Sequence, residues 1–133
     1  MDHSMSHVEQ LLKGLEFFGN WSNYILVTTV AALGWVASTA RAPISPRALR
    51  WVIGCLCASI VFAVFTLAMI PLVAENITAE TKSFYELSPK FDLIYTIGPE
   101  VSLKLKWVCW PQHILFLVGI AIYSFASIRA LKR

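Results

Sequence analysis

The sequence predicts an all-α membrane protein in which three spanning helices form a bundle. The 133-residue chain is 57% hydrophobic and only 14% charged, whereas soluble domains carry about 25% charged residues. The apolar residues are concentrated in three uncharged runs, each close to the ~20 residues that a helix needs to cross the hydrocarbon layer. Backbone amides have no water partner in lipid, so isolated runs of this kind are stable there only as helices.

Each apolar run predicts one span, and together they predict one membrane domain over the whole chain. The expected spans are residues 21–39, 46–74 and 108–129. Ser45 is a good N-cap for the second span, and Pro46 suits its first position because the missing N–H would have no helical partner there. Pro111 suits the first turn of the third span for the same reason.

Positive charge collects on one side of the three spans. Arg41, Arg47 and Arg50 connect the first two spans, and Arg129, Lys132 and Arg133 follow the third, with no acid among them. All eight acidic residues lie in the N-terminal segment and in the segment between spans two and three. Because positive residues are retained on the cytoplasmic side, the N-terminus is expected outside and the C-terminus inside a plasma (inner) membrane crossed several times.

An amphipathic helix is predicted before the first span, over residues 4–19. Ser6 followed by Glu9 forms a capping-box pattern, apolar residues recur at three- and four-residue steps, and Gly19 is suited to end the helix. Such a helix can lie on the outer membrane surface or simply cover the top of the bundle, and the second arrangement is the more usual one.

The segment 75–106 is expected to form a small extracytoplasmic cap. Residues 101–107 alternate apolar and polar side chains, which favours a β-strand. Together with residues 91–97 and the turn at Gly98, they predict a β-hairpin. The alternative is a helix that begins at Pro99 and leads into the third span.

Small residues and interfacial aromatic rings are the expected packing and anchoring positions. Small side chains let helices approach closely in lipid, where no hydrophobic force drives them together, and tryptophan prefers the membrane–water interface. The helix-packing candidates are Gly34, Gly54, Ala58 and Gly119, and the interface anchors are Trp21, Trp107 and Trp110.

No sequence pattern predicts catalysis. The uncharged runs within the three spans contain no nucleophile–base pair and no phosphate-binding glycine loop, and arginines occur only near the span ends. Cys55 and Cys57 are one residue apart and are expected to pack as small apolar side chains. His113 is the one histidine near a span and could bind haem, a metal or a quinone, but a bis-histidine haem would need a second intramembrane histidine. We expect no cofactor.

The N-terminal residues Met1–His7 carry imidazole and thioether groups, a combination that suits copper. This opening resembles the extracellular tails of the high-affinity copper transporter family, which implies weak metal binding by His3, Met5 and His7. The resemblance ends there, because the second span has no MxxxM pair and the third has Gly119 but no GxxxG. We therefore do not assign the chain to that family.

These observations favour a small non-enzymatic membrane protein that acts as an accessory, assembly or interaction subunit. Its expected partners are the lipid bilayer and either another membrane protein or further copies of itself, and its composition excludes nucleic-acid binding. Two alternatives remain: a homo-oligomeric channel or transporter for a small solute or metal ion, lined in part by Gln112 and His113, and a cofactor-binding membrane anchor.

Overall fold

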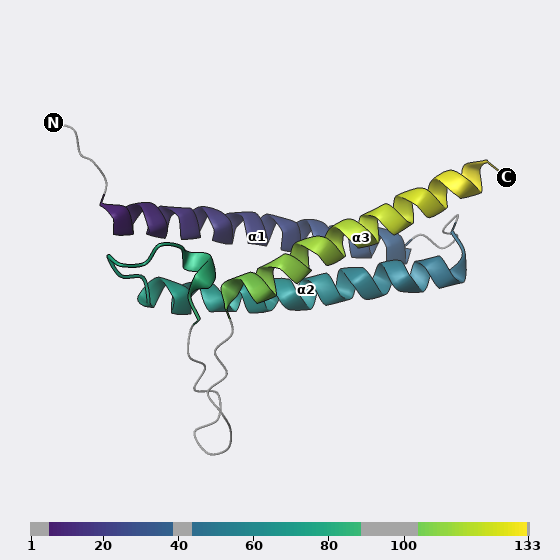
Figure 1. Cartoon of the computed structure of the whole chain (residues 1–133). Coiled ribbons are helices and arrows are strands. Elements are labelled where there is room, and N and C mark those ends of the chain that lie inside the picture. The colour runs from purple at the N-terminus through teal and green to yellow at the C-terminus, as the bar shows by residue number, and fades with distance from the viewer. Residues whose placement is uncertain (1–5, 39–43, 89–103, 133) are drawn as a thin grey trace, which may run out of the picture.

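Three long helices form the protein in the computed structural model, which describes residues 6–38, 44–88 and 104–132. The helices are α1 (His7–Ser38), α2 (Pro46–Glu75) and α3 (Leu105–Leu131), and a 3-10 turn, η1 (Phe84–Glu86), lies before α3 (Figure 1). The described part of the chain contains no strand. The all-helical class is therefore confirmed.

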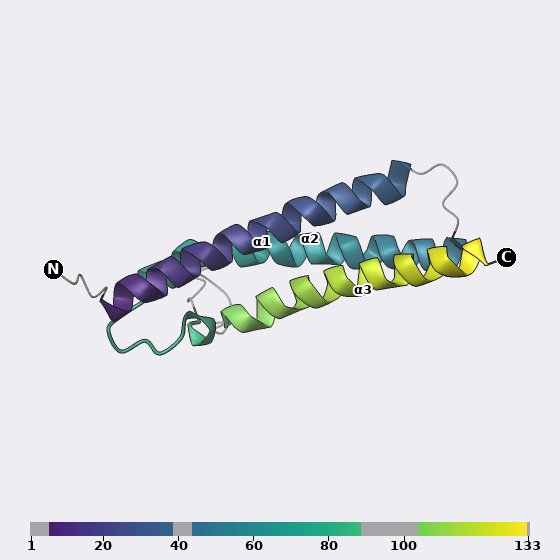
Figure 2. The ribbon, with the colours of Figure 1, turned by 90° about the horizontal axis from the view of Figure 1, so that it is seen from above.

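Helix α2 is the centre of the bundle. Both α1 and α3 pack along it and contact each other far less, and Figure 2 shows α2 between them. Successive helices run in opposite directions, so η1 and the start of α1 lie at one end of the bundle. The C-terminus of α3 and the start of α2 lie at the other end (Figure 1).

Two of the helices are long and apolar enough to cross a membrane. Among the described residues these are Pro46–Glu75 and the Leu105–Ala130 part of α3. The second helix begins as predicted, because the Oγ of Ser45 accepts from the N–H of Ala48 at 3.3 Å and Pro46 follows at the first helical position. The capping box is also confirmed, since the Ser6 N–H donates to the carboxylate of Glu9 at 2.8 Å.

Two predicted helix boundaries are wrong. Gly19 does not end a helix, because α1 runs unbroken from His7 to Ser38. Its missing side chain instead allows close approach of α2, where a Cβ at Gly19 would lie 3.1 Å from Ile70 Cδ1. Helix α3 begins at Leu105 rather than after Trp107, so Pro111 lies inside the helix and not in its first turn.

The predicted hairpin strand over residues 101–107 is wrong at its end, because residues 105–107 are the first turn of α3. Alternation over so few residues does not separate a strand from a helix that buries one side, and here Leu105 is fully buried while Lys106 is half-exposed. The remainder of the hairpin, and the alternative start at Pro99, lie outside the described residues.

Two apolar clusters make up the core, one toward each end of the bundle. The first contains Leu15 and Phe18 of α1, Met69 and Val73 of α2, and the start of α3. The second is formed by Val36, Val52 and Leu56. Polar side chains are buried between the two clusters, and they form the candidate site.

Candidate functional site

A layer of three buried polar residues joins the helices, and we call Ser22, Ser59 and Gln112 the polar layer. All three are fully buried. The hydroxyl of Ser22 donates to Gln112 Oε1 at 3.1 Å, and Gln112 Nε2 donates to the Ser22 carbonyl at 3.2 Å. The hydroxyl of Ser59 donates to the Gln112 carbonyl at 2.8 Å. One residue of α3, Gln112, is thus hydrogen-bonded to both α1 and α2.

His113 lies beside the polar layer and has a protein partner at each ring nitrogen. The indole N–H of Trp21 donates to His113 Nε2 at 3.2 Å, and His113 Nδ1 lies 2.7 Å from the Cys109 carbonyl. Since an indole can only donate and a carbonyl can only accept, these partners assign the neutral tautomer protonated at Nδ1. Ligation of a metal or haem by Nε2 would therefore require Trp21 to move away.

The start of α3 is covered by three aromatic rings that contact one another in tilted and edge-to-face arrangements, and we call them the aromatic cap: Phe18, Phe84 and Tyr85. The ring centroids are 4.3 Å apart for Phe84 and Tyr85 and 5.6 Å apart for Phe18 and Tyr85. Partial burial raises the pKa of the Tyr85 phenol. The cap anchors the segment after α2 onto α1.

An ion-pair network fastens the same segment to α3. Glu86 accepts from Lys104 at 3.0 Å and also from Lys106. Hydrogen bonds from Lys106 and Lys104 lower the pKa of the Glu86 carboxyl. At the far side of the segment, His7 Nε2 bonds the Thr81 carbonyl at 2.8 Å, which attaches the start of α1.

A cavity of about 410 Å³ opens between the polar layer and the aromatic cap. Its lining residues are Phe18, Trp21, Tyr85, Lys106, Cys109, Trp110 and His113. Two polar side chains of the lining are already engaged: Lys106 pairs with Glu86, and His113 bonds Trp21 and the Cys109 carbonyl. Cys109 and His113 both line the cavity, but the Cys109 thiol donates to the Lys106 carbonyl at 3.7 Å, and His113 Nδ1 bonds the Cys109 carbonyl rather than its thiol.

Of the predicted helix-packing glycines, one lies against a neighbouring helix and two face open space. Gly119 is buried, and a Cβ there would lie 3.1 Å from Leu56 Cδ2. Gly34 and Gly54 face open space, with no described atom within 4 Å of such a Cβ, and Ala58 is half-buried.

The predicted interface anchors Trp21, Trp107 and Trp110 are all exposed, with 51%, 64% and 63% of their surface accessible. Trp21 and Trp110 lie on the rim of the cavity below the aromatic cap. Of the metal candidates, His3 and Met5 lie outside the described residues, and His7 bonds Thr81. Within the described ranges, no three His, Cys, Asp or Glu side chains gather as a metal site would require.

Sequence reasoning missed the polar layer as a unit. Its members are far apart in the chain, since the pairing of Ser22 with Gln112 joins positions 90 residues apart. The available signal was one strongly polar side chain, Gln112, inside an apolar run.

No protein-family model, curated protein or solved structure matches this chain.

Proposed function

We propose that the chain is a small, non-enzymatic membrane protein with three spans that serves as an accessory or assembly subunit of a membrane complex. One observation carries this proposal: the five polar residues that are fully buried in the described part of the chain bond one another or the backbone. The Oγ of Ser127, a partly buried residue, is the exception and has no hydrogen-bond partner there. The hydroxyls of Thr29 and Thr66 donate to backbone carbonyls of their own helices. The residues of the polar layer hydrogen-bond one another. Such an interior holds helices together rather than exposing reactive groups.

Membrane insertion is supported by the outer surface of the bundle. Large apolar side chains are exposed on every helix, among them Val30 of α1, Phe65 of α2 and Leu117 of α3. A water-soluble monomer rarely exposes so much contiguous apolar surface. Helix α1 carries no charge from Trp21 to Ser38 and packs along α2, which supports it as the third span beside the two more apolar helices.

Orientation follows from the separation of charge. Arg47 and Arg50 are near the start of α2, and Arg129 is in the last turn of α3. These two helix ends lie at one end of the bundle, whereas η1, which contains Glu86, and the start of α1 lie at the other end (Figure 1). With the positive end retained in the cytoplasm, the proposed topology has the N-terminus outside and the C-terminus inside the plasma (inner) membrane.

Contact with another membrane protein is supported by the glycines that face open space. In lipid, a glycine on an outer helix face permits close approach of a second helix, and Gly34 and Gly54 have no such neighbour within the described chain. A channel route through Gln112 and His113 would have to break the bonds that these residues make to Ser22 and Trp21.

The proposal is tested by purifying the tagged full chain from native membranes in a mild detergent. We expect a complex larger than the monomer that contains a different membrane protein in a fixed ratio. Gly54→Leu should weaken that association while leaving the helix content unchanged. Liposomes that hold the pure chain should show no solute flux. Recovery of a monomer or of a homo-oligomer that conducts solute would contradict the proposal.

A further inference from the structure

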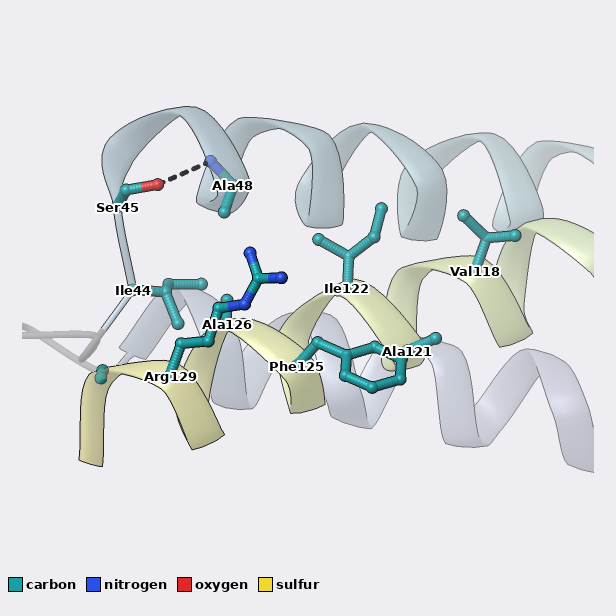
Figure 3. Close-up of a pocket in the computed structure, with 10 residues that line it drawn as sticks. Ile44, Ser45, Ala48, Val118, Ala121, Ile122, Phe125, Ala126 and Arg129 are labelled. Atoms are coloured by element: carbon teal, nitrogen blue, oxygen red, sulfur yellow. Dashed lines mark hydrogen bonds between the residues drawn. The ribbon is translucent and has the colours of Figure 1, made fainter. Parts of the chain in front are cut away.

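A second cavity, of about 660 Å³, lies at the arginine-rich end of the bundle between the start of α2 and the last turns of α3. Ser45 and Ala48 line it from α2, and Val118, Phe125 and Arg129 line it from α3 (Figure 3). We call it the Arg129 cavity. It shares no residue with the cavity below the aromatic cap.

The cationic group of this cavity is the guanidinium of Arg129. Figure 3 shows the Arg129 guanidinium extending from α3 toward the first turn of α2. Within the described part of the chain, Arg129 makes no ion pair. The described acidic residues lie in the opposite half of the bundle: Glu9, Glu16, Glu75, Glu80 and Glu86. Among the described residues, the charge that lines this cavity is therefore positive, with no acidic side chain in the same half of the bundle.

The rest of the lining is apolar and extends toward the middle of the bundle. Val118 precedes Arg129 by about 16 Å along the helix axis at 1.5 Å per residue, and Val118 and Phe125 are both exposed to the cavity side of α3. Ser45 adds one polar group at the mouth. Its Oγ already accepts from the Ala48 N–H, so its own hydrogen remains available to donate.

We propose that the Arg129 cavity binds one anionic phospholipid. A cation, a hydroxyl donor that lines the same cavity and an apolar wall match a phosphate and the first part of an acyl chain. The planar guanidinium suits bidentate bonding to phosphate, and basic clefts between membrane helices commonly hold anionic headgroups. This inference rests on the proposed membrane insertion, with the arginine-rich end at headgroup level.

The experiment places the full chain in nanodiscs of mixed phosphatidylcholine and phosphatidylglycerol and counts the lipid that stays bound after transfer to detergent, by native mass spectrometry. Wild type should retain one phosphatidylglycerol. Arg129→Gln should lower that retention at least about tenfold, the loss expected for a charge-assisted hydrogen bond. Arg50→Gln is the matched control, because it removes an equal charge from an exposed residue that does not line the cavity.

A second variant keeps the arginine. Val118→Trp fills the apolar wall, lies on an exposed position and should also abolish retention, with helix content unchanged by circular dichroism. Equal loss in Arg129→Gln and Arg50→Gln would overturn the site in favour of a general surface charge effect. Displacement of the lipid by inorganic phosphate would overturn the lipid assignment, as would retention of phosphatidylcholine to the same extent. Failure of the chain to enter nanodiscs would instead overturn the membrane proposal, and the site with it.

Discussion

Gln112 connects α3 to both neighbouring helices with the atoms of a single residue. Its amide exchanges two hydrogen bonds with Ser22, and its carbonyl accepts a third from Ser59. In an apolar interior, an amide that loses these partners is destabilising, because it has given up its hydrogen bonds to water and gained none in the protein. The three residues are therefore expected to act as one unit.

Removing the amide tests this coupling. Gln112→Ala should lower the free energy of unfolding by about 1 kcal/mol, the scale measured for hydrogen bonds between membrane helices. Ser22→Ala removes the hydroxyl partner, so adding it to Gln112→Ala should cost less than the sum of the single effects. The measurement is unfolding by a denaturing detergent, followed by circular dichroism. Strictly additive losses would show that the two side chains are independent.

The attachment of η1 should depend on pH through Glu86. Its lysine partners hold the pKa of the carboxyl below the ordinary value of 4.5. A carboxyl whose pKa is lower in the folded than in the unfolded state stabilises the folded state at pH values above the unfolded pKa. This stabilisation is lost as the pH falls through the pKa of the folded state. Amide-exchange protection of residues 84–87 should therefore be constant at neutral pH and fall only below about pH 4.5.

Glu86→Gln provides the control for this prediction. The amide cannot ionise, so protection in the variant should already be low at neutral pH and should not change on acidification. A loss of protection in wild type that begins above pH 6, or an identical pH profile in the variant, would assign the effect to another group.

At the scale of the elements, the sequence predicted a helix start correctly where capping residues close to it in the chain determine that start. Ser45 with Pro46, and Ser6 with Glu9, satisfy helix N-termini within a few residues, and both starts are observed. Gly19 was misjudged because a glycine that ends a helix and one that admits a neighbouring helix look alike in sequence. Only the position of Ile70 on α2 distinguishes them.

The site was less predictable because its contacts are not local. Trp21 and His113 are 92 residues apart in the chain and meet only after α1 and α3 have packed on α2. Sequence reasoning identified His113 as a candidate ligand and Trp21 as an interface anchor. It had no means of showing that each is the hydrogen-bond partner of the other.

The two kinds of glycine position lead to opposite expectations for the same substitution. Gly119→Leu places side-chain atoms against buried Leu56 and should destabilise the bundle by about 1–3 kcal/mol, as overpacking does. Gly54→Leu enters open space and should change the stability of the purified chain by less than about 0.5 kcal/mol. Detergent-unfolding curves of the two variants compare them directly. Similar losses in both would show that Gly54 is packed.

The whole molecule is organised as a bundle with chemically different ends. Arg47, Arg50 and Arg129 lie at one end, while the aromatic cap and the Glu86 network lie at the other. Charge asymmetry of this kind orients membrane helices, and the Arg129 cavity opens at the positive end. The account depends most on α1 crossing the membrane together with α2 and α3, because α1 is the least apolar of the three helices.

Reporter fusions at the two termini and in the segment between α2 and α3 test that dependence most directly. Alkaline phosphatase is active only outside the cytoplasm, and green fluorescent protein exported in an unfolded state fluoresces only inside it. Three spans predict an external N-terminus, an external segment between α2 and α3 and an internal C-terminus. An internal N-terminus, with the other two reporters unchanged, would leave only α2 and α3 across the membrane and would contradict the account.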